Sequence, residues 1–148
     1  PGTLYLIPVA LGGEDVASVL SPALLMRLAH LRHFIVENPK SARRFLKAAG
    51  YPLPLADAAF HTLDEHTPPA ELPHLLAPLH AGCDCGLLSE AGCPAVADPG
   101  AALVRLAHAQ DLRIVPLVGP SAILLALMAS GMNGQRFAFH GYLPVNVR

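Results

Sequence analysis

Short apolar runs alternate with stretches of helical periodicity along nearly the whole chain. The run from Leu4 to Pro8 has the pattern of a buried strand and leads into a loop that contains Gly12 and Gly13. The spacing of apolar residues then predicts a helix from Val16 to about His30, which Pro22 kinks or divides. This order of strand, loop and helix is the unit that the rest of the chain repeats.

The same alternation continues to residue 140. Strands are predicted over 33–37, 58–63, 85–89 and 112–117, with a short one over 136–140, and helices over 39–49, 68–82, 98–110 and 121–130. Leucines from Leu72 to Leu79 give one helix an apolar face, and residues 123–128 are expected in the core. Strands and helices that alternate over short connections predict an α/β fold, with a mostly parallel sheet of about five strands and helices on both faces.

The composition is apolar for a chain of this size. Of 148 residues, 53% are hydrophobic and 14% are charged, against a usual charged share of about 25%. A sheet buried on both faces, a membrane segment, or a surface covered by a missing partner would each account for this. The uncharged stretch from Ile114 to Gln135 is interrupted by Pro116, Gly119 and Pro120. We therefore interpret it as strand, loop and helix and predict no membrane span.

Charge is nearly balanced overall but uneven along the chain. Ten basic and eleven acidic residues give a net charge of −1, which excludes a globally basic nucleic-acid-binding module. Six of the ten bases fall between positions 27 and 47, where Glu37 is the only acid. Lys40, Arg43, Arg44 and Lys47 share one face of a predicted helix, which either contacts phosphates or is simply solvated.

The three cysteines give little support for a disulfide framework or a metal site. Cys83, Cys85 and Cys93 are odd in number, which favours free thiols in a reducing cytoplasm. With His80 they could be written as a zinc site, but the spacing matches no standard finger. No metal is therefore predicted.

The loops that follow the strands hold the candidate site, because ligands of parallel α/β sheets bind beyond the carboxyl ends of the strands. These loops cover 8–13, 37–40, 64–67, 89–94 and 117–121, and they contain no standard nucleotide, hydrolase or zinc-protease motif. The loop from Leu88 to Gly100 is unusual, because Gly92 permits close backbone approach and Asp98 can cap a helix. The segment from Val118 to Ala122 repeats this design.

Two of these loops resemble those of a known family. Ser89-Glu-Ala-Gly-Cys-Pro-Ala-Val-Ala-Asp-Pro-Gly100 is similar to the pattern S-D-A-G-T-P-x-x-x-D-P-G, and Val118-Gly-Pro-Ser-Ala122 is similar to P-G-P-S-A. Both patterns are typical of the tetrapyrrole methylase superfamily of S-adenosylmethionine-dependent methyltransferases, in its small-subunit ribosomal RNA methyltransferase I branch. Further similarities lie at Tyr5 to Pro8, at Glu37 with Arg43, and at Phe137 to Pro144, so the resemblance spans the chain in order.

The chain departs from the family pattern in two loops that are expected to face the substrate. Glu37-Asn-Pro-Lys40 stands where the family has E-D-T-R, and Leu11-Gly-Gly-Glu-Asp15 stands where it has I-G-N-L-x-D. The first change removes one carboxylate and replaces a forked guanidinium by a point charge. The resemblance therefore supports the methyl-donor site more strongly than a particular acceptor.

The resemblance implies a role for each loop. The glycine-containing loops would hold S-adenosylmethionine, Glu37 or His66 would be the base that a ribose 2′-hydroxyl needs, and the basic helix would bind RNA. Taken without the resemblance, the same loops are explained as tight turns capped by Asp98 and Ser121, and Asp98 keeps its capping role in either case. The residues assigned to the donor are Pro8, Ser89, Glu90, Ala91, Gly92, Pro94, Gly119, Pro120, Ser121 and Ala122, and those assigned to the RNA are Lys40, Arg43 and Arg44.

The resemblance also implies how the whole enzyme is organised. Residues 1–141 would form the N-terminal α/β domain, and residues 142–148 would begin a linker to a second domain absent from the chain. The enzyme would be a cytoplasmic homodimer that methylates a ribose 2′-hydroxyl of ribosomal RNA in the small subunit. The alternatives are a methyltransferase of the same superfamily that acts on a tetrapyrrole or another small acceptor, and a donor-binding protein without catalysis.

Overall fold

Five parallel strands form the centre of the protein. The computed structural model describes residues 1–13 and 15–145. The strands are β1 (Thr3–Ile7), β2 (His33–Val36), β3 (Ala59–Thr62), β4 (Cys85–Leu88) and β5 (Arg113–Pro116), in the order β3-β2-β4-β1-β5. Leu4 of β1, which lies between β4 and β5, is opposite Cys85 on one side and Ile114 on the other. Because parallel strands need crossover connections, a helix-containing segment joins each strand to the next.

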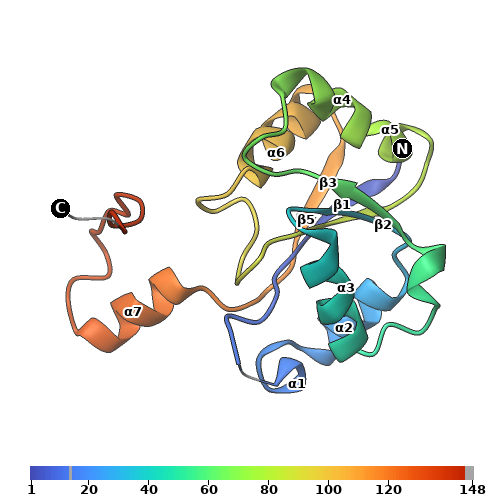
Figure 1. Ribbon diagram of the computed structural model, residues 1–148. Helices are drawn as coiled ribbons and strands as arrows, with labels where there is room; N and C mark the ends of the chain where they lie inside the picture. The colour runs from blue at the N-terminus through green and yellow to red at the C-terminus, as the bar shows by residue number, and fades with distance from the viewer. Residues whose placement is uncertain (14, 146–148) are drawn as a thin grey trace.

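Helices cover both faces of the sheet. They are α1 (Val16–Val19), α2 (Pro22–Ala29), α3 (Pro39–Ala48), α4 (Leu72–Leu75), α5 (Ala77–His80), α6 (Gly100–Ala109) and α7 (Ala122–Ser130), with 3-10 turns at Leu55–Asp57 and Pro69–Glu71. Figure 1 shows α1, α2 and α3 on one side of the sheet and α4, α5 and α6 on the other. The predicted α/β fold with a five-stranded parallel sheet is confirmed.

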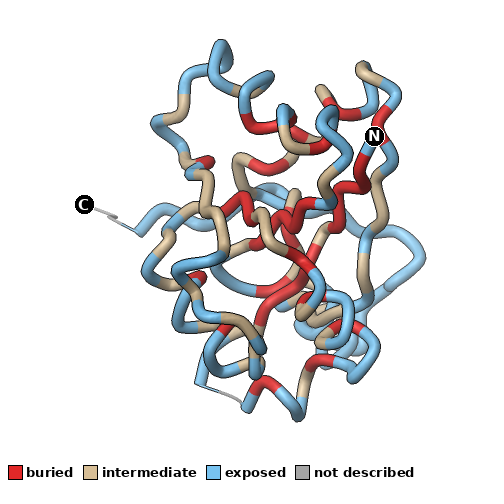
Figure 2. Tube along the Cα trace, turned by 90° about the vertical axis from the view of Figure 1, so that its right-hand side faces the viewer, coloured by how far each residue is buried: buried red, intermediate tan, exposed pale blue. Residues whose placement is uncertain are grey.

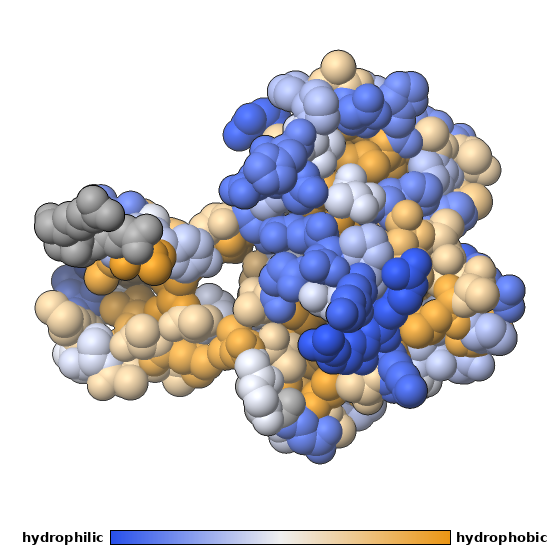
Figure 3. All heavy atoms as spheres, viewed as in Figure 1, coloured by the Kyte–Doolittle hydropathy of each residue, from blue (hydrophilic) through white to orange (hydrophobic). Residues whose placement is uncertain are grey.

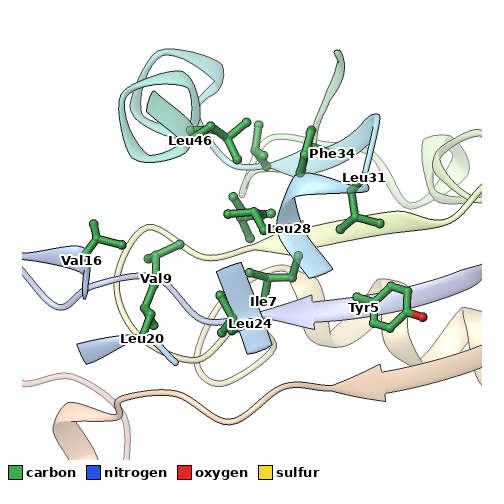
Figure 4. Close-up of a cluster of buried hydrophobic side chains, with 13 residues drawn as sticks. Tyr5, Ile7, Val9, Val16, Leu20, Leu24, Leu28, Leu31, Phe34 and Leu46 are labelled. Carbon is green, nitrogen blue, oxygen red and sulfur yellow. The ribbon is translucent and has the colours of Figure 1, made fainter. Parts of the chain in front are cut away.

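Successive residues of each strand belong to two separate cores. In β1, Ile7 packs in the core under α1–α3, whereas Leu4 packs in the core under α4–α6. In β2, Phe34 and Ile35 divide in the same way. Figure 4 shows the first core, where Leu28 of α2 is only 1% exposed. Buried residues concentrate along the sheet (Figure 2), and this explains why the strands are continuous apolar runs in the sequence.

Local sequence determines where several helices begin and end. The Ser21 hydroxyl accepts a hydrogen bond from the Leu24 amide at 3.1 Å and caps α2. Pro22 occupies the first turn of α2 and separates it from α1, which confirms the predicted division. Gly131 ends α7 in the left-handed conformation, with φ +67°.

Three details of the sequence prediction are wrong. The helix expected over 68–82 is a 3-10 turn followed by the short helices α4 and α5, because Pro73 and Pro78 interrupt the backbone hydrogen bonding. The described residues 136–140 contain no strand, because they follow α7, which lies apart from the sheet. Finally, Pro99 is expected to be the first residue of a helix capped by Asp98, but α6 begins one residue later, at Gly100; the Asp98 carboxylate still accepts a hydrogen bond from the Gly100 amide.

The last helix, α7, lies apart from the body of the protein. Figure 1 shows it beyond β5, away from the other helices, and none of its residues is buried. The prediction that residues 123–128 belong to the core is therefore wrong. Met128 is 77% exposed and Tyr142, in the following segment, is 79% exposed. Figure 3 shows apolar atoms across this part of the molecule, as at surfaces that contact another domain or protein.

Candidate functional site

Three loops at the carboxyl ends of the strands are hydrogen-bonded to one another. The Val9 amide, after β1, donates to the Gly92 carbonyl at 3.1 Å, and the Ser89 hydroxyl donates to the same carbonyl. The Cys93 thiol lies 3.3 Å from the carbonyl oxygen of Pro120, after β5. Burial raises the pKa of the Cys93 thiol, so this group stays protonated and donates to that oxygen. The loops after β1, β4 and β5 therefore form one unit.

Two glycines allow these loops to approach closely. Gly92 has φ +66°, and a Cβ atom there would lie 2.9 Å from the Pro120 carbonyl oxygen. A Cβ atom on Gly119 would lie 2.1 Å from Cβ of Pro8, which is fully buried. Pro8 and Gly119 thus pack against each other as the frame of the site, and larger residues would separate the loops.

The joined loops enclose a cavity of about 280 Å³, here called the β4–β5 cavity. Four residues assigned to the methyl donor line it, namely Ala91, Gly92, Ser121 and Ala122. Other residues assigned to the donor lie elsewhere: Pro8, Gly119 and Pro120 belong to the frame, Pro94 is buried, and Ser89 and Glu90 line neighbouring hollows. The lining residues that the sequence analysis did not assign to the donor are Leu11, Cys93, Val96, Ile123 and Tyr142.

A second cavity, the acidic cavity, has a volume of about 420 Å³ and lies among the loops after β2, β3 and β4. Five carboxylates line it, together with Asn38 and His66; they belong to Glu37, Asp64, Glu65, Glu90 and Asp98. The structure thus brings the two candidate bases, Glu37 and His66, to one cavity. Glu90 lines this cavity while its neighbour Ala91 lines the β4–β5 cavity, so a single loop separates the two.

The electrostatic setting of the two candidate bases differs. Glu37 is half-buried, and desolvation raises the pKa of its carboxyl, with smaller contributions from Asp98 and Glu90. The side chain of His66 is 83% exposed, and its Nε2 lies 3.3 Å from the Glu65 carboxylate. The Glu37 carboxylate is therefore partly shielded from water and holds a proton more strongly than an ordinary glutamate, whereas the His66 side chain is exposed to solvent beside Glu65.

Asp98 is held by the backbone of its own loop. Its carboxylate accepts hydrogen bonds from the Ala95 amide at 3.0 and 3.1 Å and from the Gly100 amide at 2.8 Å. Burial raises the pKa of this carboxyl, and the amides of Gly100 and Ala95 act in the opposite direction. Asp98 is thus both a helix cap and a brace within the loop after β4.

The basic face of α3 is divided by its surroundings. The Arg43 guanidinium lies over the Phe60 ring, 4.7 Å from the ring centroid. Arg44 lines a hollow of about 300 Å³ with Gly12, Phe45 and Glu90, here called the Arg44 groove. Figure 3 shows a strongly hydrophilic patch over α3. The predicted basic face therefore exists, but its two arginines point to different neighbours.

Neither a metal site nor a transmembrane helix occurs within residues 1–13 and 15–145. No group of three or more His, Cys, Asp or Glu side chains in this part of the chain could hold a metal ion. Cys85 is buried in the sheet and Cys93 is bonded to the β5 loop, so neither joins His80 in a ligand set. None of the described helices has the length and hydropathy of a transmembrane segment.

Comparison with known proteins identifies relatives over nearly the whole chain. No protein-family model matches the sequence. The chain is 36% identical over 143 residues to ribosomal RNA small subunit methyltransferase I of Pseudomonas aeruginosa, 36% over 144 residues to that of Xylella fastidiosa, and 38% over 144 residues to that of Mesorhizobium japonicum. Each match covers 97% of the chain. The chain is homologous to these methyltransferases.

The resemblance based on the two loops is thus confirmed. The chain spans about half the length of these methyltransferase I relatives, namely 48%, 50% and 46% of the three proteins. It shares with them the segment that contains the five-stranded sheet and its loops.

The contact between Gly119 and Pro8 leads to a test of the loop frame. Gly119→Ala places a Cβ atom against the ring of Pro8, so we expect the free energy of unfolding to fall by about 1–3 kcal/mol. Gly134→Ala is the matched control, because its Cβ would meet only Leu127 at 3.9 Å. Urea unfolding followed by circular dichroism measures both. Equal unfolding midpoints for the two variants would contradict the packing described for Gly119.

Proposed function

We propose that the chain is the donor-binding α/β part of an S-adenosylmethionine-dependent methyltransferase that acts on a ribose 2′-hydroxyl of ribosomal RNA. The observation that carries this proposal is the convergence of the two methyltransferase-like loops on one cavity. Ala91 and Gly92 come from the first loop and Ser121 and Ala122 from the second, and all four line the β4–β5 cavity. The homology to ribosomal RNA methyltransferases supports the same conclusion.

The β4–β5 cavity suits a methyl donor. S-adenosylmethionine when bound supplies an already electrophilic methyl group, so the protein has to hold the donor, align the acceptor and exclude water. Ala91 is exposed and could offer its backbone groups, the Ser121 hydroxyl could offer a further hydrogen bond, and Val96 and Ile123 could supply apolar contacts. The sulfonium is a cation, and the acidic cavity on the other side of the loop favours a positive charge at this edge of the sheet.

The acidic cavity would receive the acceptor hydroxyl. A ribose hydroxyl is a poor nucleophile, and a carboxylate with a raised pKa is the better base for it. The pKa of Glu37 is raised, and its side chain is half-buried at the end of β2. We therefore assign Glu37 as the base, whose carboxylate oxygen accepts the proton of the ribose hydroxyl. His66 would then interact with the RNA at the entrance, since its side chain is exposed.

The basic face of α3 would hold the RNA backbone. Lys40 and Arg44 are exposed on this helix, which begins directly after Glu37 and Asn38. Phosphates bound there would lie next to the acidic cavity, whose carboxylates repel phosphate but accept hydrogen bonds from ribose. This division of charge would place the sugar, and not the phosphate, against Glu37.

The exposed apolar surface supports a larger assembly. We propose that α7 and the segment after it, with Tyr142 and Leu143 largely exposed, contact the remainder of the enzyme or a second copy in a homodimer. The boundary after residue 141 belongs to this proposal, and residues 146–148 of the expected linker lie outside the described residues. The cysteines Cys83, Cys85 and Cys93 are unpaired, which agrees with a cytoplasmic protein.

Donor binding is the first test. We expect isothermal titration calorimetry to detect S-adenosylmethionine binding to the chain, and Ala91→Leu to weaken it at least about tenfold by filling the cavity. Ala109→Leu, at the exposed end of α6, is the matched control and should leave the affinity unchanged. An unchanged affinity in Ala91→Leu would contradict the assigned donor site. Binding without methyl transfer to ribosomal subunits would favour a donor-binding protein without catalysis.

The raised pKa of Glu37 leads to a pH prediction. The base must be ionised, and a raised pKa delays ionisation to higher pH. We therefore expect the methylation rate to increase with pH through a value above the ordinary 4.5 of glutamate. Glu37→Gln should lower the single-turnover rate by about 10²–10⁴-fold and remove this acidic limb. In the control His66→Gln the rate should still increase with pH in the same way. If the rate of Glu37→Gln also keeps this pH dependence, Glu37 is not the base.

Salt dependence tests the interaction with RNA. We expect Arg44→Ala to reduce the slope of log affinity against log salt by about 0.7 for each phosphate that Arg44 neutralises on single-stranded RNA. Arg113→Ala removes the same charge at the opposite end of the strands and serves as control. Fluorescence anisotropy with a labelled ribosomal RNA oligonucleotide measures both slopes. Equal slopes for the two variants would show that α3 makes no specific phosphate contact.

A further inference from the structure

We propose that Asp98 is a positioning residue that holds the turn at Ala95–Ala97 and thereby shapes the wall shared by the β4–β5 and acidic cavities. The inference rests on the proposed function, because it concerns how that site binds the methyl donor. It goes beyond the role of helix cap, which accounts for only part of the hydrogen bonding of this carboxylate.

The hydrogen bonds of Asp98 exceed what a cap requires. Capping of α6 uses one bond, from the Gly100 amide to Oδ1 at 2.8 Å. The Ala95 amide donates to both carboxylate oxygens, at 3.0 Å to Oδ1 and 3.1 Å to Oδ2. The hydrogen bond of Oδ2 is thus to the preceding loop, at Ala95, and it connects the turn to the start of α6.

The turn that Asp98 holds is one that alanine does not favour. Ala95 has φ +65° and Ala97 has φ +57°, and both values lie in the left-handed region where a Cβ atom is strained. Among the described residues, Asp111 is the one other non-glycine residue with a positive φ. Such a conformation persists only where the surroundings impose it. The charge-assisted bonds to Asp98 supply that constraint at Ala95.

This turn forms part of both cavities. Val96, between the two strained alanines, lines the β4–β5 cavity together with Gly92 and Cys93. Ala97 and Asp98 line the acidic cavity. If the turn relaxes, Val96 leaves the donor side and Ala97 leaves the acceptor side. One carboxylate thus sets the shape of both halves of the site.

Donor affinity and loop order test this role together. Asp98→Ala is expected to weaken S-adenosylmethionine binding about tenfold or more, because the Ala95 amide no longer has its charged acceptor. Asp98→Asn keeps one acceptor oxygen for the Gly100 amide but cannot bond Ala95 through both oxygens. It should therefore retain the unfolding midpoint while its donor affinity still falls several-fold.

A second-site change distinguishes positioning from general damage. Glycine adopts φ +65° without strain, so Asp98→Ala with Ala95→Gly should bind the donor at least about threefold more tightly than Asp98→Ala alone. Ser21→Ala is the matched control, because it removes a cap from α2, away from both cavities. It should lower the unfolding midpoint and leave donor affinity unchanged.

Amide hydrogen exchange of Ala95–Ala97, measured without donor, gives a readout independent of binding. We expect faster exchange in Asp98→Ala and wild-type rates in Ser21→Ala. The proposal is overturned if exchange at the turn is unchanged in Asp98→Ala, or if wild-type protein binds the donor and Asp98→Ala binds it equally well. A wild-type protein that does not bind S-adenosylmethionine would refute the proposed function, and the exchange rates alone would then decide whether Asp98 holds the turn.

Discussion

Parallel pairing of β1 with both β4 and β5 is the constraint on which the rest of the structure depends. It directs the carboxyl ends of the strands to one edge of the sheet, so loops far apart in sequence meet there. Pro8, Gly92 and Gly119 come from three such loops; Gly119 packs against the Pro8 ring and Gly92 against the Pro120 carbonyl, so neither glycine has space for a Cβ atom. The β4–β5 cavity exists because these three loops are held together at that edge.

Charge is distributed unevenly over the same edge of the sheet. Five carboxylates surround one cavity, whereas the residues that line the neighbouring β4–β5 cavity are uncharged. The basic residues stand on α3, beside the acidic cavity. In the described part of the chain the one contact within salt-bridge distance joins the Glu65 carboxylate to the His66 imidazole, so no Lys or Arg neutralises these carboxylates directly. The proposed cationic donor and the proposed RNA backbone would therefore be attracted to separate positions at this edge of the sheet.

The apolar composition has two physical causes. A sheet covered on both faces requires strands that are apolar on both sides, and the cores around Ile7 and Leu4 meet that requirement. The second cause is α7, which is apolar all around and unburied within this chain. Such a helix is stable in a protein when other surfaces cover it. The methyltransferase relatives that the chain matches are about twice as long as the chain.

The sequence by itself determined the fold class, the Ser121 cap and the positions of the two glycine-containing loops after β4 and β5, because these follow from local periodicity and from Gly, Pro and Ser at set positions. Only the tertiary structure decided what surrounds each loop. Nothing local distinguishes α7 from a core helix, since burial depends on distant elements. The partners of Arg43 and Arg44 likewise depend on packing across the sheet edge. The strained turn held by Asp98 could not be predicted either, because alanine residues give no indication of a positive φ.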